Sequence, residues 1–120
     1  MVVVDARSSV PPYEQVRAQL AAQIRDGALR VGDRLPTVRG LAEELGIAAN
    51  TVARAYRELE QERLVETRGR NGTTVAWSQD DAERELQQAA AQYAERARAL
   101  SVEPAIAARV VGRALGFDGR

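Results

Sequence analysis

Two amphipathic helical patterns lie so close together in this sequence that the helices they predict must cross steeply. The first pattern runs from Val38 to Leu45 and the second from Val52 to Leu59, each with its apolar residues at helical spacing. Thr37 directly precedes the first pattern and is its predicted N-cap. Only six residues separate the two patterns, and the first of these is Gly46, which suits the left-handed end of a helix. Two helices joined by so short a turn predict a helix-turn-helix.

Further elements flank this motif on both sides. Apolar residues recur at helical spacing from Tyr13 to Ile24, which predicts a helix that follows two prolines and ends at a glycine. Two β-prone runs, 64–68 and 73–77, enclose the turn 69–72 and predict a hairpin. A helix, a helix-turn-helix and a hairpin in this order predict a winged helix.

The composition changes after Trp77, where residues 81–100 are rich in Ala, Glu, Arg and Gln. The apolar residues of this stretch recur at intervals of 4, 3, 4 and 3, the seam that one helix offers another. Ser101 is the predicted N-cap of a last helix, with Pro104 in its tolerated first turn. The residues predicted to form the contact are Leu86, Ala90, Tyr93, Ala97, Leu100, Ile106 and Val110.

A partner copy is the expected cover for this apolar stripe. The segment after Trp77 has 43 residues, and two helices of that size cannot close a good core. A seat against the winged helix of the same chain is the alternative. The stripe is therefore predicted to make the protein a homodimer.

The fold class that these patterns predict is α+β, mainly helical, in three parts. A flexible N-terminal arm (1–10) precedes a winged helix-turn-helix domain (11–77), and a two-helix dimerisation tail (78–120) follows. The arm lacks the basic start of a signal peptide, and no stretch approaches the about 20 apolar residues that a membrane span requires. We therefore expect a cytoplasmic protein with no membrane partner.

The residue types that the chain lacks exclude several kinds of chemistry. All 17 basic residues are Arg, and Lys, His and Cys are absent. This excludes a Cys/His metal site, a thiol or Ser–His nucleophile and a lysine Schiff base. Adjacent carboxylates such as Glu43 and Glu44 diverge by ~100° on a helix and do not form a facing acid/base pair. We expect no catalytic residue, no metal and no cofactor, and hence a protein that is not an enzyme.

Several patterns between Pro11 and Val75 resemble the GntR family of bacterial transcriptional regulators. They are P-x-Y-x-Q-V, then I-R-x-G-x-L-x-x-G-x-R-L-P-T-x-R-x-L-A-x-x-L-G-I, and then N-T-V-x-x-A-Y-x-x-L with G-x-x-G-T. The segment after Trp77 is similar to the short dimerisation tail of the YtrA-like branch. The resemblance implies that Arg39, in the P-T-x-R segment, contacts the DNA backbone or a base edge.

Three places in the chain depart from the family pattern. Val31 stands where Pro usually precedes Gly, and Arg63 stands where Gly often precedes Leu-Val. Ala48 and Ala49 approach the second helix of the motif, where polar residues, Pro or Arg are common. The resemblance therefore implies the fold but not the base preference.

The second helix of a helix-turn-helix enters the major groove with its N-terminal residues at the base edges. Asn can pair with adenine and Arg with guanine, while Ala and the Thr methyl group can touch a thymine methyl group. A helix N-terminus favours phosphate, and Arg on a wing commonly reaches a minor groove or a phosphate. The candidate DNA-binding residues are Arg34, Thr37, Arg39, Ala49, Asn50, Thr51, Arg54, Arg68, Arg70, Asn71 and Gly72.

Several of these residues also have a purely structural interpretation. Asn50 is then only the N-cap of its helix, and Arg54 is an ordinary solvated residue. Arg39 then pairs with Glu43 one turn away, and the arginines of the hairpin tip are solvated.

The charge of the winged helix is nearly balanced, because residues 11–77 hold 10 Arg and 9 acidic residues. DNA binding therefore requires the two signs to lie on different faces. We expect the arginines to converge on the edge that reads DNA and the acidic residues to lie mostly away from it. The acidic residues concerned are Glu43, Glu44, Glu58, Glu60, Glu62 and Glu66.

These observations predict a sequence-specific DNA-binding transcriptional regulator that acts as a homodimer on a palindromic operator, and we expect a repressor. Double-stranded DNA and a second copy are the expected partners. A small-molecule effector is left open, since a ligand pocket of ~300 Å³ or more needs a domain to enclose it. The alternative is a winged-helix protein–protein interaction module without specific DNA binding. In that case Arg39→Ala or Arg54→Ala leaves function unchanged, whereas Leu86→Asp abolishes it.

Overall fold

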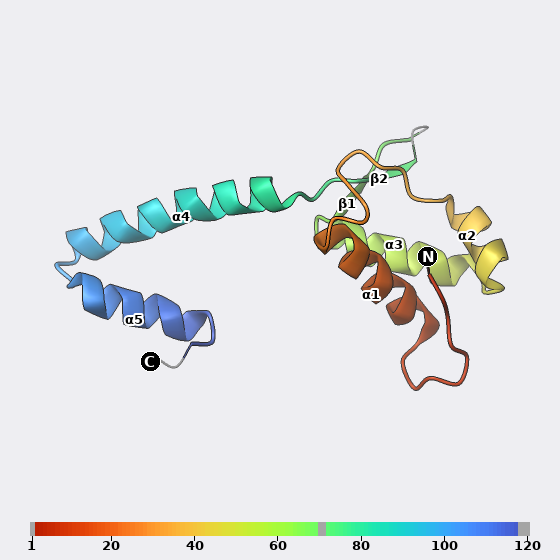
Figure 1. The fold of residues 1–120 in the computed structure, drawn as a ribbon, viewed down its shortest axis with the longest axis horizontal. Helices are drawn as coiled ribbons and strands as arrows, with labels where there is room; N and C mark the ends of the chain where they lie inside the picture. Colours follow the sequence, from red (N-terminus) through yellow and green to blue (C-terminus); the bar gives the residue numbers. More distant parts are fainter. Residues whose placement is uncertain (1, 70–71, 118–120) are drawn as a thin grey trace. The chain divides into compact units, whose positions relative to one another are not determined.

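The computed structural model describes residues 2–69 and 72–117, and the chain forms two compact units, Met1–Gln79 and Asp80–Arg120 (Figure 1). The first unit holds α1 (Pro12–Arg25), α2 (Val38–Leu45), α3 (Ala49–Gln61), β1 (Val65–Thr67) and β2 (Thr73–Val75). The second unit holds α5 (Pro104–Ala114) and, from Asp80 onward, α4 (Gln79–Ala99). Helices and one small antiparallel sheet make the fold α+β and mainly helical, as the sequence predicts.

The core of the first unit lies between α3 and the helices α1 and α2, which both pack on it. Periodicity predicted the buried face of α3 correctly, because the four residues expected on that face are all buried. Full burial of one such aliphatic side chain contributes about 1.5–3 kcal/mol. The buried residues of the three helices are Val16, Leu20, Ala21, Ile24, Leu41, Ala42, Val52, Ala55, Tyr56 and Leu59.

The helix-turn-helix has the predicted ends at α2. The Thr37 side chain caps this helix by accepting a hydrogen bond of 3.0 Å from the Gly40 amide. A Cβ added at Gly40 would lie 2.9 Å from that cap oxygen, so glycine leaves room for the cap. Gly46 ends the helix at φ 68°, in the left-handed region that glycine tolerates. The Thr37 and Gly46 predictions are confirmed.

The start of α3 differs from the prediction. Ala48 is the N-cap, with extended backbone and no side-chain cap, and Asn50 is already the second helical residue. The alternative interpretation, in which Asn50 only caps this helix, is wrong. Its exposed side chain is not used to cap the helix.

The wing is a hairpin extended by a third segment. β1 and β2 pair antiparallel, with Val65 opposite Val75. Beyond β2, Arg34 forms a bridge with Thr74, and the Leu35 amide donates to the Thr73 carbonyl at 2.8 Å. Since side chains alternate across a strand, one face of the sheet buries Leu35, Val65 and Val75 in the core. Arg70 and Asn71, two of the predicted wing residues, lie outside the described residues.

The N-terminal arm lies against α1. The Val3 amide donates to Gln19 Oε1 at 2.9 Å, and the Asp5 amide donates to Gln15 Oε1 at 2.8 Å. Val2 and Val4 pack against the core. The first residues of the segment expected to be a flexible arm therefore make defined contacts with the first unit.

The second unit is a pair of helices with little interior. Among the residues described from Asp80 onward, Ala107 is the only apolar residue that is buried. The Tyr93 hydroxyl donates to the Ala107 carbonyl at 2.7 Å and ties α4 to α5. Glu103 is the N-cap of α5, and Ser101 lies at φ 58°, so the prediction that Ser101 caps this helix is wrong. Within the described residues, neither helix is long and apolar enough to cross a membrane.

Candidate nucleic-acid interface

The outer face of α3 carries polar side chains opposite its buried face. Asn50, Arg54 and Arg57 are exposed and follow one another at spacings of four and three residues, so they share one side of the helix. Ala49, at the helix start, is exposed as well, and Thr51 is half-buried. Arg57 is absent from the predicted site, although its spacing of seven residues from Asn50 is a sufficient signal.

The outer face of the wing holds two of the predicted arginines. Arg34 and Arg68 line one open groove of about 580 Å³ together with Glu66 and Thr74. Glu66 lies opposite Thr74 in the sheet, and Thr74 lies opposite Arg34. The fold thus brings together a residue before α2 and a residue after β1 that are 34 positions apart.

A smaller cavity connects the wing with the start of α2. Arg34, Thr37 and Gly72 line this space of about 250 Å³ together with Tyr56. The Tyr56 hydroxyl donates to the Pro36 carbonyl at 2.7 Å, which fixes α3 to the segment before α2. Burial raises the pKa of Tyr56 to about 12.

Arg39 lies in the first turn of α2 with its side chain exposed. Among the described residues Arg39 forms no ion pair with Glu43, the pairing that was its structural alternative. Among residues 2–69 and 72–117, Arg34 and Arg57 likewise form no ion pair. These three guanidinium groups are therefore available for an anion. Four others of the first unit likewise form no ion pair among the described residues, those of Arg7, Arg25, Arg30 and Arg63.

The expectation that the acidic residues lie away from the arginines is wrong at two places. Glu58 accepts from Arg54 Nε at 3.3 Å, and Glu66 accepts from Arg68 Nη2 at 2.8 Å. The Glu66 hydrogen bond raises the pKa of Arg68. Both pairs involve exposed arginines, and solvent screens exposed ion pairs so that they contribute little to stability. A phosphate can therefore displace either carboxylate at small cost.

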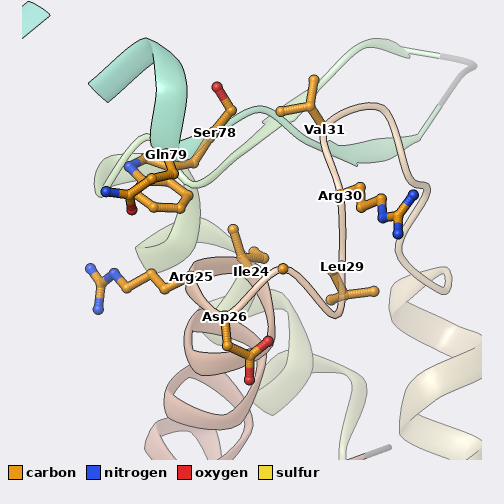
Figure 2. Close-up of a pocket in the computed structure, with 10 residues that line it drawn as sticks. Ile24, Arg25, Asp26, Leu29, Arg30, Val31, Ser78 and Gln79 are labelled. Carbon is orange, nitrogen blue, oxygen red and sulfur yellow. The ribbon is translucent and has the colours of Figure 1, made fainter. Parts of the chain in front are cut away.

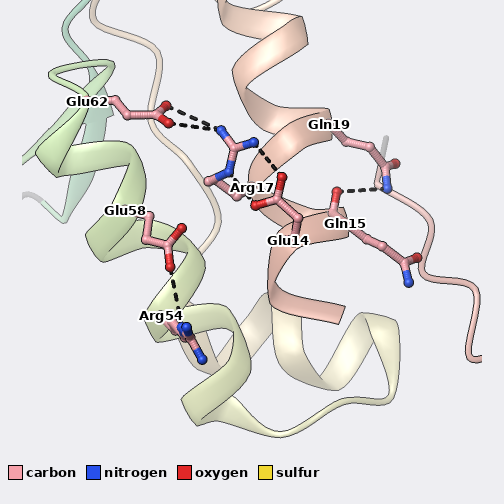
Figure 3. Close-up of polar contacts among 7 residues, drawn as sticks. All are labelled: Glu14, Gln15, Arg17, Gln19, Arg54, Glu58 and Glu62. Carbon is pink, nitrogen blue, oxygen red and sulfur yellow. Dashed lines mark hydrogen bonds and ion pairs between the residues drawn. The ribbon is translucent and has the colours of Figure 1, made fainter. Parts of the chain in front are cut away.

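A third ion-pair group joins α1 to α3 (Figure 3). Arg17 donates to Glu14 on its own helix at 2.6 Å and to Glu62 at the end of α3 at 3.0 Å. The hydrogen bond between Arg17 and Glu14 lowers the pKa of Glu14 and raises that of Arg17.

Arg54 is not an ordinary solvated residue either, because its guanidinium carbon lies 3.6 Å from the centroid of the Tyr13 ring on α1.

A cavity of about 510 Å³ lies at the end of α1 (Figure 2). Ile24, Leu29 and Trp77 contribute apolar walls, and Arg25 and Arg30 stand on opposite sides of it. Its volume is within the ~300–1,000 Å³ range of small-molecule sites. Ser78 and Gln79, where the chain enters α4, also line it.

Comparison with known proteins identifies the family. Residues 12–75 match the family described as bacterial regulatory proteins, gntR family. The chain belongs to the GntR family. This GntR-family chain is 49% identical over 106 residues to the HTH-type transcriptional regulator Rv1152 of Mycobacterium tuberculosis strain H37Rv, covering 88% of this chain and 87% of that protein.

A further relative and a solved structure link this sequence and fold to the control of genes and to operator DNA. The HTH-type transcriptional repressor YtrA of Bacillus subtilis strain 168 is 42% identical over 76 residues, covering 63% of this chain and 58% of YtrA. The solved structure of the AraR DNA-binding domain in complex with operator ORX1 aligns with a TM-score of 0.56 and 25% identity, covering 63% of this chain and 95% of that domain. The GntR-family chain is thus a DNA-binding transcriptional regulator with a winged helix-turn-helix.

The residues predicted for dimerisation divide into two groups in this GntR-family chain. Tyr93 and Ala97 line a cavity of about 230 Å³ with residues of α5, so part of the α4 stripe faces its own chain. Leu86 and Leu100 keep 69% and 60% of their surface exposed. Ala90, Ile106 and Val110 are exposed as well.

Proposed function

We propose that this regulator binds a palindromic operator as a homodimer and acts as a repressor. Residues 11–77 would bind DNA, and residues 78–120 would dimerise. The observation that carries the DNA-binding part is the set of exposed side chains on α3, α2 and the wing. Arg34, Arg39 and Arg57 have no ion pair among the described residues, and Asn50 is not used as a helix cap.

The proposed DNA contacts divide by their place in the fold. The start of α3 would read bases through Asn50, with Ala49 and Thr51 beside it. Thr37 and Arg39 at the start of α2, and the residues of the wing, would hold the phosphate backbone. Because phosphates dominate the affinity, binding should weaken steeply as the salt concentration rises.

The dimer is supported by the exposed apolar side chains of the second unit. A pair of helices with one buried apolar residue among those described cannot be stable alone. A second copy would cover these side chains and place two reading helices on one duplex, with half-sites about one turn apart. Binding the second half-site at high effective concentration would raise the affinity without new contacts.

Selection of bound fragments from random duplex DNA with the purified protein tests the specificity. We expect an enriched inverted repeat, and failure to enrich any sequence contradicts the proposal. Arg39→Ala and Arg57→Ala should each weaken binding to the selected duplex by about 10-fold or more, since a hydrogen bond to a charged group contributes about 1.5–3 kcal/mol. Arg63→Ala is the matched control, because it removes the same charge from an exposed position after the end of α3.

The same variants test the alternative of a protein–protein interaction module. If the protein is such a module, Arg39→Ala and Arg57→Ala should leave its function unchanged. A reporter gene controlled by the selected operator would test repression, since deletion of the regulator should raise expression. No chemical role is proposed for any residue, so we propose that the regulator is not an enzyme, and its DNA target would place it in the cytoplasm.

For a small-molecule effector we propose the cavity beside Trp77. It has a suitable volume, and its wall includes the residues that lead into α4. Trp77 is the single tryptophan of the chain, so its fluorescence would report a bound compound. A compound that releases DNA without changing this fluorescence would place the effector elsewhere.

A further inference from the structure

We propose that Tyr13 on α1 is a positioning residue for DNA recognition, because its ring holds the Arg54 guanidinium in a fixed orientation. This inference rests on the proposed function of α3 as the reading helix. The two residues lie 41 positions apart in the sequence and meet where α1 packs on α3.

The Tyr13 ring is a fixed platform. Tyr13 is half-buried in the first turn of α1, three residues before the buried Val16. One turn further on, Arg17 bonds both to Glu14 and to Glu62 and so joins α1 to α3 (Figure 3). These contacts fix the ring relative to the helix that carries Arg54.

Arg54 is held on two sides. The guanidinium lies over the Tyr13 ring, with 3.6 Å between its carbon and the ring centroid. Its Nε edge donates to Glu58 at 3.3 Å. Among the residues that the structure describes, the two terminal nitrogens donate to none, and 54% of the side chain stays exposed.

This arrangement leaves the paired terminal N–H groups for two acceptor atoms outside the protein. Guanine presents such a pair in O6 and N7, and a phosphate presents two oxygens. An arginine ordered before binding loses less rotamer entropy on binding than a free one. Arg57, on the same face of α3 and without an ion pair in the described part of the chain, is the free counterpart.

Because the ring contact already exists in the free protein, its loss weakens binding by leaving Arg54 to be ordered on the duplex. Since a dimer contains two such pairs, Tyr13→Leu should weaken operator binding about 10-fold or more. Tyr13→Phe keeps the ring and should bind within about twofold of the wild type. Thermal unfolding of both variants measures any effect on the fold separately.

A double-mutant cycle gives the decisive comparison. In the Arg54→Ala background, Tyr13→Leu should change affinity for the selected duplex by less than about twofold, because nothing remains to be positioned. A loss of the same size with and without Arg54 would overturn the proposal, as would wild-type affinity for Tyr13→Leu alone. A loss restricted to the selected duplex would indicate a base edge, and an equal loss on a scrambled duplex would indicate a phosphate.

NMR of the free protein separates this proposal from the proposed function. The Arg54 side-chain protons above the Tyr13 ring should be shifted upfield, and the shift should persist in Tyr13→Phe and vanish in Tyr13→Leu. Absence of the shift in the wild type would overturn the positioning role even if the protein binds its operator. Equal binding of selected and scrambled duplexes by the wild type would instead contradict the proposed specificity.

Discussion

The two units of this regulator bury apolar surface very differently. In the first unit, α1, α2, α3 and the wing enclose a shared core, and side chains such as Val16, Val52 and Leu59 have no exposed surface. Among the described residues of the second unit, Ala107 is the only apolar residue that is buried. Leu86 and Leu115 there keep about 70% of their surface exposed. The first unit thus has a core that stabilises it, whereas the described part of the second unit buries little apolar surface of its own.

The largest expected effect is on the core of the first unit. Leu59→Ala should reduce the free energy of unfolding by about 2–5 kcal/mol, because it leaves a cavity among fully buried neighbours. Trp77 packs against this core, so its fluorescence in a urea titration reports the first unit. Leu115→Ala in the second unit is the matched control and should change that transition by less than about 0.5 kcal/mol. Equal effects would mean that the two units do not differ as described.

The next effect sharpens the comparison at the second unit. Leu86→Asp should shift the protein from about twice 13.1 kDa towards the monomer mass in sedimentation and weaken operator binding by about 10²-fold. The Trp77 unfolding transition should stay unchanged, since Leu86 is not part of the core of the first unit. Gln88→Asp adds the same charge to the opposite side of α4 and should leave the dimer intact. A wild-type protein that is monomeric at micromolar concentration would contradict the role of α4.

A pH titration compares buried and exposed tyrosines. Tyr56, in the first unit, keeps its proton in the folded protein to about pH 12, whereas an unfolded tyrosine loses it near pH 10. The contribution of Tyr56 to the free energy of unfolding, on the order of 1–2 kcal/mol, is therefore complete below about pH 10 and is lost as the pH rises towards 12.

Urea unfolding at pH 8 and pH 11 measures this loss, and the chain has no Lys or Cys to titrate in the same range. Tyr56→Phe should remove the alkaline loss, although it also removes the hydrogen bond to Pro36. Tyr93→Phe, in the second unit, should retain the loss. An unchanged alkaline slope in Tyr56→Phe would rule out Tyr56 as its source.

The smallest effect concerns a helix end. Thr37→Ala should cost about 1 kcal/mol because the Gly40 amide loses its side-chain acceptor. Thr37→Ser keeps an acceptor and should retain most of the stability. The same urea titration measures both variants, and equal losses would show that the cap hydroxyl is not the stabilising group.

Sequence periodicity was sufficient to predict the buried residues of a helix that buries one regular face. The apolar spacing in α3 identified its whole buried face, and the Thr37 cap and the Gly46 end followed from local conformational preferences. The same spacing also points to Arg57, seven residues after Asn50, but the predicted site omits it. Local pattern failed at Asn50 and Ser101, because the neighbouring turns place the N-caps at Ala48 and Glu103.

The contacts that each arginine side chain makes could not be predicted from the sequence. Arg54 meets Tyr13 only because α1 packs on α3, and Arg34 reaches the groove of Arg68 only because residue 34 pairs with β2. Glu58 and Glu66 were expected to lie away from the arginines, yet each accepts from one. Contacts of this kind depend on distances and side-chain directions that a linear pattern does not contain.

The sequence alone determined the winged helix-turn-helix and the family, because local periodicity, caps and turns specify these elements one at a time. Only the tertiary structure decided which guanidinium groups are held and which are free, since ion pairs and ring stacking require residues from different elements to meet. It also left the apolar stripe of α4 only partly covered by α5, because two helices enclose too little volume to bury it.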